Sequence, residues 1–104
     1  MRGDLYRLPV RKSARGHEQR GPRYGVVMQN DDLPLSTVLV APTSTSAQPA
    51  SFRPVIDVDG TPTRVLPEQT RAIDANLLGQ FAGRLAAYEL AQIDAACRTI
   101  FDLR

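Results

Sequence analysis

Residues that build metal sites and disulfides are scarce in this chain. Its 104 residues include one cysteine, Cys97, one histidine, His17, and no tryptophan. A lone cysteine can form neither an intramolecular disulfide nor a thiolate metal cluster. Any metal site would depend mainly on carboxylates, and Asp57 with Asp59 on one strand face is a pattern that solvated turns also produce. The composition therefore predicts a protein that works without a metal or other cofactor.

Long apolar runs are also absent from the sequence. No stretch approaches the roughly 18 consecutive apolar residues that a membrane-spanning helix needs, and Asp4 stands where a signal peptide would have apolar residues. We therefore expect a cytoplasmic protein that is not inserted in a membrane. A chain of 104 residues can enclose one hydrophobic core, so we expect a single domain over residues 1–104. Its functional site is then expected in a surface groove or across a dimer.

Positive charge is concentrated at the start of the chain. The formal net charge is only +2, from 13 basic and 11 acidic residues. Seven of the basic residues lie within the first 23 positions, which hold only two acidic ones: Arg2, Arg7, Arg11, Lys12, Arg15, Arg20 and Arg23 against Asp4 and Glu18. Such a segment favours binding to a polyanion. Arginine accounts for 12 of the 13 basic residues, which suits bidentate phosphate contacts, although a GC-rich genome produces the same bias.

The first seventy residues have the pattern of a compact all-β unit. Short runs rich in apolar or β-branched residues alternate with clusters of Gly, Pro, Ser and Asp. They predict strands at residues 3–8, 23–29, 36–42, 53–58, 63–67 and 69–73. The continuous apolar runs at residues 26–28 and 38–41 predict central strands that are covered on both faces.

The pattern changes near the C-terminus, where apolar residues recur at helical spacing. From Ala86 onward they follow one another at intervals of three or four positions, at Leu90, Ile93, Cys97 and Ile100. This spacing predicts an amphipathic helix packed on the sheet, with Cys97 as a buried packing thiol rather than a nucleophile. No Ser, Thr, Asp or Asn precedes the helix as a cap, so we expect a frayed or shifted beginning.

Two segments between the predicted strands have the composition of loops. Residues 11–22 are polar and basic and contain two glycines and a proline, as expected of a loop between paired strands. Residues 44–51 are rich in Ser, Thr, Ala and Pro, which fits a surface lid as well as a plain linker. The densest polar cluster, residues 16–23, lies just before a predicted buried strand. Polar groups gathered at a strand mouth are typical of a binding site, although a solvated hairpin loop has the same composition.

Five short segments form a pattern that runs through almost the whole chain. They are Arg2 to Tyr6, Gly16 to Arg23, Val26 to Asp31, Val40 to Thr43 and Leu66 to Asp74. In order and spacing they resemble the MazF/PemK family, the toxins of bacterial toxin-antitoxin systems. The resemblance implies a mainly β fold, namely an SH3-like small barrel of the CcdB/PemK type with a C-terminal amphipathic helix.

The same resemblance implies an activity and a pair of catalytic residues. Members of the family are mRNA interferases, which are endoribonucleases that cut single-stranded RNA at specific sequences and so inhibit translation and growth. The family's catalytic arginine and threonine match Arg23 and Thr43 in this sequence. A guanidinium and a hydroxyl suit the negative charge that develops when a ribose 2′-hydroxyl attacks the adjacent phosphorus. That reaction leaves a 2′,3′-cyclic phosphate and a 5′-hydroxyl and needs no metal.

Other positions match family residues that contact or orient the RNA. The substrate-binding candidates are His17, Glu18, Gln19, Asn30, Glu68, Gln69 and Arg71. Most of them could instead form a strand-end hydrogen bond or ion pair. His17 replaces a serine common in the family. The ordinary pKa of histidine, about 6.5, suits proton transfer, so His17 could act in catalysis, stack on a base or simply be solvated. Tyr24 stands where relatives usually have proline, and we expect its ring to pack the strand rather than stack on RNA.

The resemblance also implies partners. A homodimer would hold RNA in the groove between its subunits, and a cognate MazE-like antitoxin would cover that groove with an acidic, partly disordered tail. The alternative is a CcdB-like toxin, which has the same kind of barrel but poisons DNA gyrase by protein binding. A third possibility is a degenerate member that only binds RNA or antitoxin. The Arg23 and Thr43 pair and the basic first loop favour the nuclease.

Overall fold

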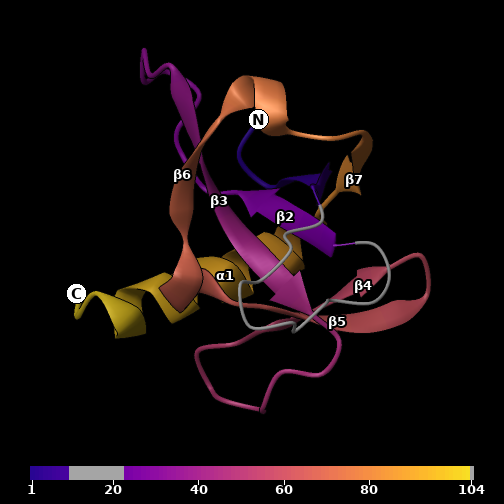
Figure 1. The fold of residues 1–104 in the computed structure, drawn as a ribbon. Helices are drawn as coiled ribbons and strands as arrows, with labels where there is room; N and C mark the ends of the chain where they lie inside the picture. The colour runs from indigo at the N-terminus through magenta and orange to yellow at the C-terminus, as the bar shows by residue number, and fades with distance from the viewer. Residues whose placement is uncertain (10–22, 104) are drawn as a thin grey trace, which may run out of the picture.

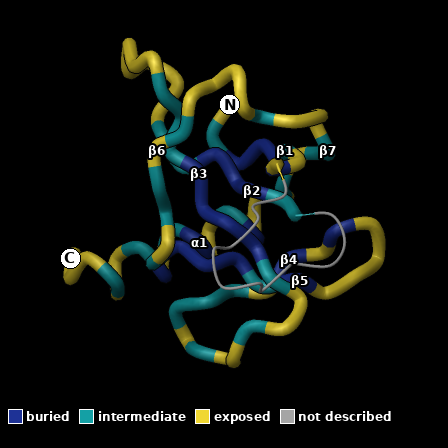
Figure 2. Tube along the Cα trace, in the orientation of Figure 1, coloured by how far each residue is buried: buried dark blue, intermediate teal, exposed yellow. Residues whose placement is uncertain are grey.

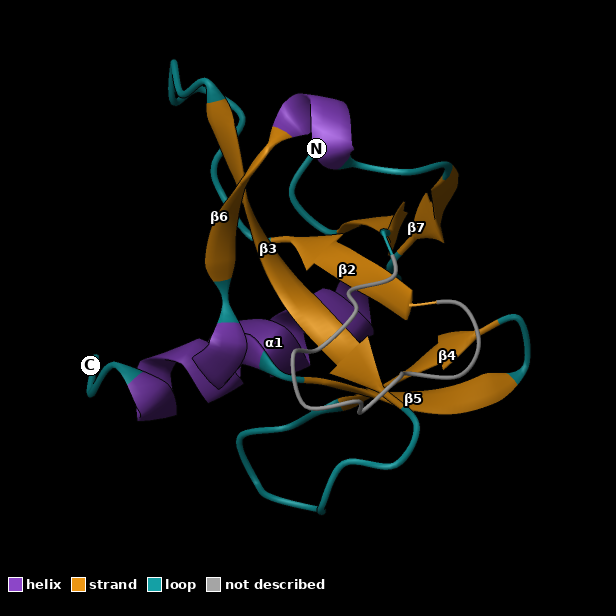
Figure 3. Cartoon of the chain, viewed as in Figure 1, coloured by secondary structure: helices purple, strands orange, loops and turns teal. Residues whose placement is uncertain are grey.

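A curled antiparallel sheet with one α-helix against it makes up the computed structural model, which describes residues 1–9 and 23–103 (Figure 1). Figure 3 distinguishes the helices, strands and loops. Within the described residues there are seven strands, two short 3₁₀-helices and one α-helix. In chain order they are β1 (Asp4–Leu8), β2 (Arg23–Val27), β3 (Thr37–Ser44), β4 (Val55–Val58), β5 (Thr61–Val65), η1 (Pro67–Gln69), β6 (Arg71–Asp74), η2 (Ala75–Leu77), β7 (Phe81–Arg84) and α1 (Ala87–Ile100).

The long strand β3 is the centre of the sheet. The strand order is β4-β5-β3-β2-β1-β7, and β6 also pairs with β3. β3 pairs with β2 along one edge. Along its other edge it pairs first with β6, at residues 37–40, and then with β5, at Thr43 and Ser44. A single strand thus belongs to both parts of the sheet, which together curl into a half-barrel (Figure 1).

One face of the sheet packs against α1 and encloses the hydrophobic core. The core side chains come from five strands and the helix and are Leu5, Val26, Ala41, Ile56, Val58, Val65 and Ile93. Figure 2 shows the buried trace running through the central strands, with exposed segments around them. Strand residues that alternate with the core side chains lie on the opposite face, away from the helix, because successive side chains point to opposite sides.

The helix obtains its N-terminal contact from Glu89, in its own first turn. The buried carboxylate of Glu89 accepts hydrogen bonds from the backbone N–H of Ala86 and from the N–H of Asp57 in β4, both at 2.9 Å. One side chain therefore satisfies a free donor at the helix start and joins the helix to the sheet. The helix starts at Ala87, one residue after the predicted pattern begins, and Glu89 supplies the contact that the missing cap would have made.

The mainly β fold with a C-terminal helix is confirmed. Six predicted strands and the helix are present, and the ends of the strands differ from the predictions by at most two residues. Both central runs contain fully buried residues, as expected of strands covered on both faces. Strand β7 is missing from the sequence-based prediction because alanine and glycine, two of its four residues, are rare in strands. Its backbone pairing with β1, with Gly83 opposite Leu5, holds it in place.

Candidate active site

Arg23 is the first residue of β2 and lies at the mouth of that strand. It pairs with Leu8 at the end of β1, and it is partly buried. The preceding residues 10–22, which include the predicted site residues His17, Glu18 and Gln19, lie outside the described residues. Because β2 and β3 are antiparallel, the start of β2 lies beside the C-terminal end of β3. Arg23 and the predicted Thr43 therefore belong to the same end of the sheet.

Thr43 lies at that end of β3, but its side chain is buried. The residue pairs with Val65 of β5 and is only 5% exposed. Its hydroxyl donates a hydrogen bond of 2.9 Å to the backbone oxygen of Tyr24. The Thr43 hydroxyl thus connects β3 to β2 immediately after Arg23, and it already has an acceptor.

Tyr24 packs against the hydrophobic core, as predicted. The guanidinium carbon of Arg7 lies 5.9 Å from the centre of its ring, a distance typical of a cation–π contact. The ring therefore helps to hold β1, β2 and the helix side of the sheet together. This packing explains why a tyrosine is acceptable where relatives usually have proline.

The η1 turn brings three further predicted site residues next to β3. The backbone N–H of Leu66 donates to the carbonyl oxygen of Pro42 at 2.9 Å, so the turn starts beside the end of β3. Glu68 and Gln69 follow within the turn, and Arg71 begins β6, which pairs with β3. The structure thus places Glu68 and Gln69 in the turn that starts beside the end of β3, and Arg71 opposite Val40 in the same strand.

Arg53 belongs to this region although no sequence pattern singles it out. Its guanidinium forms an ion pair with one carboxylate oxygen of Glu68, at 2.6 and 2.7 Å, and donates to the carbonyl oxygen of Gln48 at 3.1 Å. The other carboxylate oxygen of Glu68 is buried and has no hydrogen-bond partner in the described part of the chain. The pair connects the segment between β3 and β4 to the η1 turn. No helical or strand period joins positions that are 15 residues apart.

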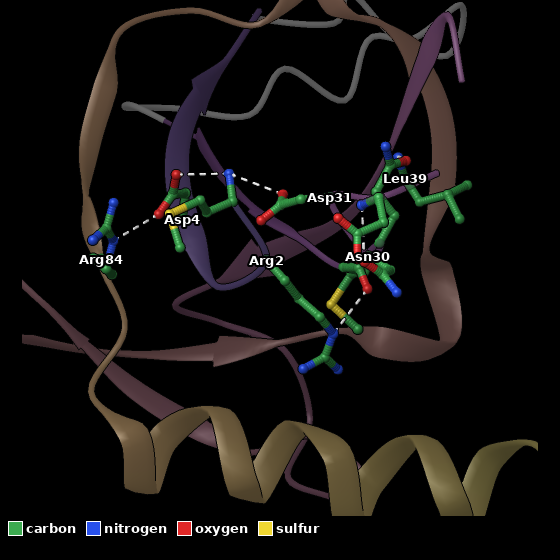
Figure 4. A network of polar contacts seen from close by, with 10 residues as sticks. Arg2, Asp4, Asn30, Asp31, Leu39 and Arg84 are labelled. Atoms are coloured by element: carbon green, nitrogen blue, oxygen red, sulfur yellow. Dashed lines mark hydrogen bonds and ion pairs between the residues drawn. The ribbon is translucent and has the colours of Figure 1, made fainter. Parts of the chain in front are cut away.

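Asn30 lies at the opposite end of β2 from Arg23. Its side-chain oxygen accepts a hydrogen bond of 2.9 Å from the backbone N–H of Asp32, which shapes the turn between β2 and β3. Figure 4 shows this turn next to the polar contacts of Arg2 and Arg84. The structure therefore places Asn30 in a turn, at the other end of β2 from the predicted site residues that it describes.

Arg2 and Cys97 have structural positions. Arg2 forms an ion pair with Asp94 of α1 and donates to the carbonyl oxygen of Met28 at 3.1 Å. One of the seven basic residues near the N-terminus thus binds the start of the chain to the helix and is not directed at a polyanion.

Cys97 packs against the core, and burial raises the pKa of its thiol. The prediction of a packing thiol is confirmed, but the residue is partly rather than fully buried.

The mouth of β2, the end of β3 and the η1 turn together form the candidate active site. A guanidinium, hydroxyl groups and an arginine–glutamate pair meet there, and such donors bind phosphate oxygens well. No three His, Cys, Asp or Glu side chains of the described residues gather as metal ligands. No helix in that part of the chain is both long and apolar enough to span a bilayer.

Comparison with known proteins identifies relatives of the chain. A family model described as a PemK-like, MazF-like toxin of type II toxin-antitoxin systems matches residues 1–101. A protein of Mycobacterium tuberculosis (strain H37Rv) that is named as a candidate toxin is 55% identical over 73 residues. The matched region covers 70% of this chain and 69% of that relative.

Solved structures of mycobacterial proteins have the same fold as this chain. An endoribonuclease in complex with its cognate antitoxin, from a mycobacterial species, has a TM-score of 0.79 and 16% identity, and the match covers 100% of this chain and 96% of that chain. The Mycobacterium tuberculosis toxin MazF-mt6 has a TM-score of 0.76 and 22% identity, and the match covers 99% of each chain. At these identities the likeness shows a shared fold.

Proposed function

Because this chain belongs to the family of PemK-like, MazF-like toxins of type II toxin-antitoxin systems, we propose that it is an endoribonuclease that inhibits growth by cutting single-stranded RNA. The observation that carries the proposal is the position of Arg23 at the mouth of β2, beside the hydroxyl groups at the end of β3. The endoribonuclease among the structural neighbours supports it through the shared fold.

The proposed reaction uses the RNA's own nucleophile. The ribose 2′-oxygen attacks the adjacent phosphorus, and the bond between phosphorus and the 5′-oxygen breaks. The 2′-hydroxyl loses a proton and the departing 5′-oxygen gains one, so the step consumes neither water nor metal. Its products are a 2′,3′-cyclic phosphate and a 5′-hydroxyl. Arg23 would stabilise the negative charge on the non-bridging oxygens as a cation, because a guanidinium with a pKa above about 12 is a poor proton acceptor.

A hydroxyl at the end of β3 would donate to the same phosphate oxygens, and the family resemblance suggests Thr43 for this role. Around this catalytic centre we place the residues that would contact or orient the RNA. They are His17, Glu18, Gln19, Asn30, Glu68, Gln69 and Arg71. For Asn30 the geometry supports an indirect role, through the shape of the β2–β3 turn. For His17, proton transfer and base stacking are both open to test.

The proposed partners are single-stranded RNA, a second copy of the chain and a MazE-like antitoxin. Exposed large apolar side chains, among them Phe81 and Tyr88, fit a chain that buries further surface against other subunits. A structural neighbour was solved with its cognate antitoxin, which supports the same kind of partner here. The cytoplasmic location stays a prediction.

Cleavage of a long, mixed-sequence RNA in the presence of EDTA tests the proposal. We expect the wild-type protein to cut at one recurring sequence and to leave 5′-hydroxyl ends. Arg23→Ala should reduce the rate by about a hundredfold or more, the typical loss when a preorganised donor to a developing oxyanion is removed. Arg98→Ala removes the same charge from an exposed position in α1 and should cut like the wild type.

The opposite outcome has a clear meaning. If the RNA stays intact while expression of the chain still stops growth, the nuclease proposal is wrong. DNA gyrase would then be the next target to test, and gyrase-dependent DNA damage would support the CcdB-like alternative.

A further inference from the structure

The segment that connects β3 to β4, residues 45–54, contributes no side chain to the hydrophobic core. None of its residues is buried, and half of them are exposed, namely Thr45, Ser46, Gln48, Pro49 and Ser51. A segment with so few apolar contacts gains little stability from packing. Polar contacts must therefore supply most of what holds it in place. The segment follows Ser44, the last residue of β3, at the end of the sheet where Arg23 begins β2 (Figure 1).

Arg53 connects this segment to the rest of the fold. Its backbone N–H donates to the carbonyl oxygen of Ala50 at 3.0 Å, and its guanidinium donates to that of Gln48 at 3.1 Å. These two bonds close the segment on itself. The carbonyl oxygen of Arg53 accepts a hydrogen bond of 3.0 Å from Arg64 in β5, and its guanidinium carbon lies 5.7 Å from the centre of the Phe52 ring. One residue thus shapes the segment and attaches it to the sheet.

The ion pair between Arg53 and Glu68 joins the segment to the η1 turn. The two side chains are 21% and 23% exposed, and their closest nitrogen and oxygen atoms are 2.6 Å apart. The turn begins at the fully buried Pro67, whose carbonyl oxygen accepts a hydrogen bond of 2.7 Å from the Thr70 hydroxyl. Salt screens an ion pair in such a position only weakly. Removing one partner leaves the other charge largely buried and without compensation.

The same geometry argues against a direct contact between Glu68 and RNA. One carboxylate oxygen already accepts hydrogen bonds from Arg53, so an RNA group that bonded to it would have to compete with the guanidinium. The other oxygen is buried, out of reach of a ligand, and has no hydrogen-bond partner among residues 1–9 and 23–103. Phosphate groups are in addition repelled by a carboxylate. Glu68 is therefore suited to positioning the segment rather than to binding RNA.

We infer that the Arg53–Glu68 ion pair fixes the conformation of residues 45–54 on the η1 turn, and that this conformation decides which RNA sequence the chain cuts. The inference rests on the proposed endoribonuclease function. Arg53 and Glu68 are positioning residues in it, and the exposed polar side chains of the segment contact the bases. When only a fraction of the molecules has the binding-competent conformation, the apparent dissociation constant rises by the inverse of that fraction. Loss of the ion pair should therefore raise KM for the preferred sequence and change kcat less.

Hydrogen exchange in the RNA-free protein tests the anchoring of the segment. We expect Glu68→Ala to speed exchange at the backbone amide of Arg53 by about tenfold or more, because less free energy is needed to open the segment locally. The amide of Met28, which donates to the carbonyl oxygen of Leu39 near the start of β3, should keep its rate. Asp32→Ala removes an exposed acid from the β2–β3 turn and is the matched control. Unchanged exchange at the Arg53 amide in Glu68→Ala would overturn the inference.

Cleavage of two short RNAs tests the selectivity. The first carries the preferred sequence, found by mapping the fragment ends from the mixed-sequence RNA, and the second differs from it by one base. We expect Arg53→Ala and Glu68→Ala each to lower the ratio of the two kcat/KM values by about tenfold or more, chiefly through a higher KM for the preferred RNA. Arg98→Ala should keep the wild-type ratio. Faster exchange in the segment with an unchanged ratio would overturn the inference.

The exchanged pair, Arg53→Glu with Glu68→Arg, separates positioning from direct contact with RNA. The two charges still attract each other after the exchange, so the double variant should recover part of the selectivity that either single charge reversal loses. Losses that simply add in the double variant would show that each residue contacts RNA by itself, and would overturn the inference. If the wild type cuts no RNA while hydrogen exchange responds as expected, the nuclease proposal fails and the anchoring of the segment is supported.

Discussion

Glu89 is expected to determine where α1 begins and how firmly it is attached to the sheet. Its carboxylate is 6% exposed and accepts two backbone hydrogen bonds of 2.9 Å, one from Ala86 and one from Asp57. A hydrogen bond to a charged group contributes about 1.5–3 kcal/mol, and alanine regains a few tenths of that through its helix propensity. We therefore expect Glu89→Ala to lower the free energy of unfolding by about 3 kcal/mol. Glu89→Gln keeps one acceptor oxygen and should cost about half as much.

Urea and thermal unfolding, followed by circular dichroism at one fixed protein concentration, measure this effect. For a domain of about 100 residues, 3 kcal/mol corresponds to a decrease in Tm of at least about 12 °C. The concentration must be fixed because self-association makes Tm depend on it. Gln92→Ala, on the exposed side of the same helix, is the control and should change stability by no more than about 0.5 kcal/mol. If Glu89→Ala unfolds at the wild-type midpoint, the two hydrogen bonds do not stabilise the helix start.

Two further predictions concern packing and pH. Gly25→Ala should lower the free energy of unfolding by about 2 kcal/mol or more, because an added Cβ would lie 2.3 Å from a methyl carbon of Val40. Urea unfolding measures this change, and a midpoint equal to that of the wild type would contradict the prediction. For Asp4, burial raises the pKa, but hydrogen bonds from the Met1 ammonium and Arg84 outweigh it and bring the pKa below its ordinary 3.8. The unfolded state then binds the proton more tightly, so the stabilisation is present above about pH 4 and is lost as the pH falls through the folded pKa. Asp4→Asn should therefore flatten the fall of the urea midpoint in that range, and an unchanged slope would refute the assignment.

The elements that could be predicted are those with a strong local pattern. Apolar and β-branched runs bounded by Gly, Pro and Ser identify six strands, and a spacing of three and four identifies the helix. Strand β7 lacks such a pattern, because its pairing with β1 depends on backbone groups that any sequence possesses. The start of α1 is a similar case. Its cap comes from Glu89 inside the helix, which also contacts a strand more than thirty residues away in sequence.

The candidate site could be predicted in part. The polar cluster before a buried strand predicts the position of Arg23 at the mouth of β2. Only the family resemblance singles out Glu68 and Gln69, and the turn in which they lie is not predicted. The face on which a hydroxyl lies could not be predicted in the same way. Thr43 and Ser44 are neighbours in an uninterrupted polar run, and a shift of one residue in register exchanges their faces.

The sequence by itself determined the class of this protein. The periodicity of its apolar residues specifies a small β fold with a terminal helix, and its basic N-terminal segment specifies a polar site at a strand mouth. These features can be predicted because they depend on composition and on short-range spacing. Only the tertiary structure decided which side chains meet there. The pairing of Arg53 with Glu68 and the burial of Thr43 depend on strand register and on the pairing of β3 with both β5 and β6, which distant parts of the chain impose together.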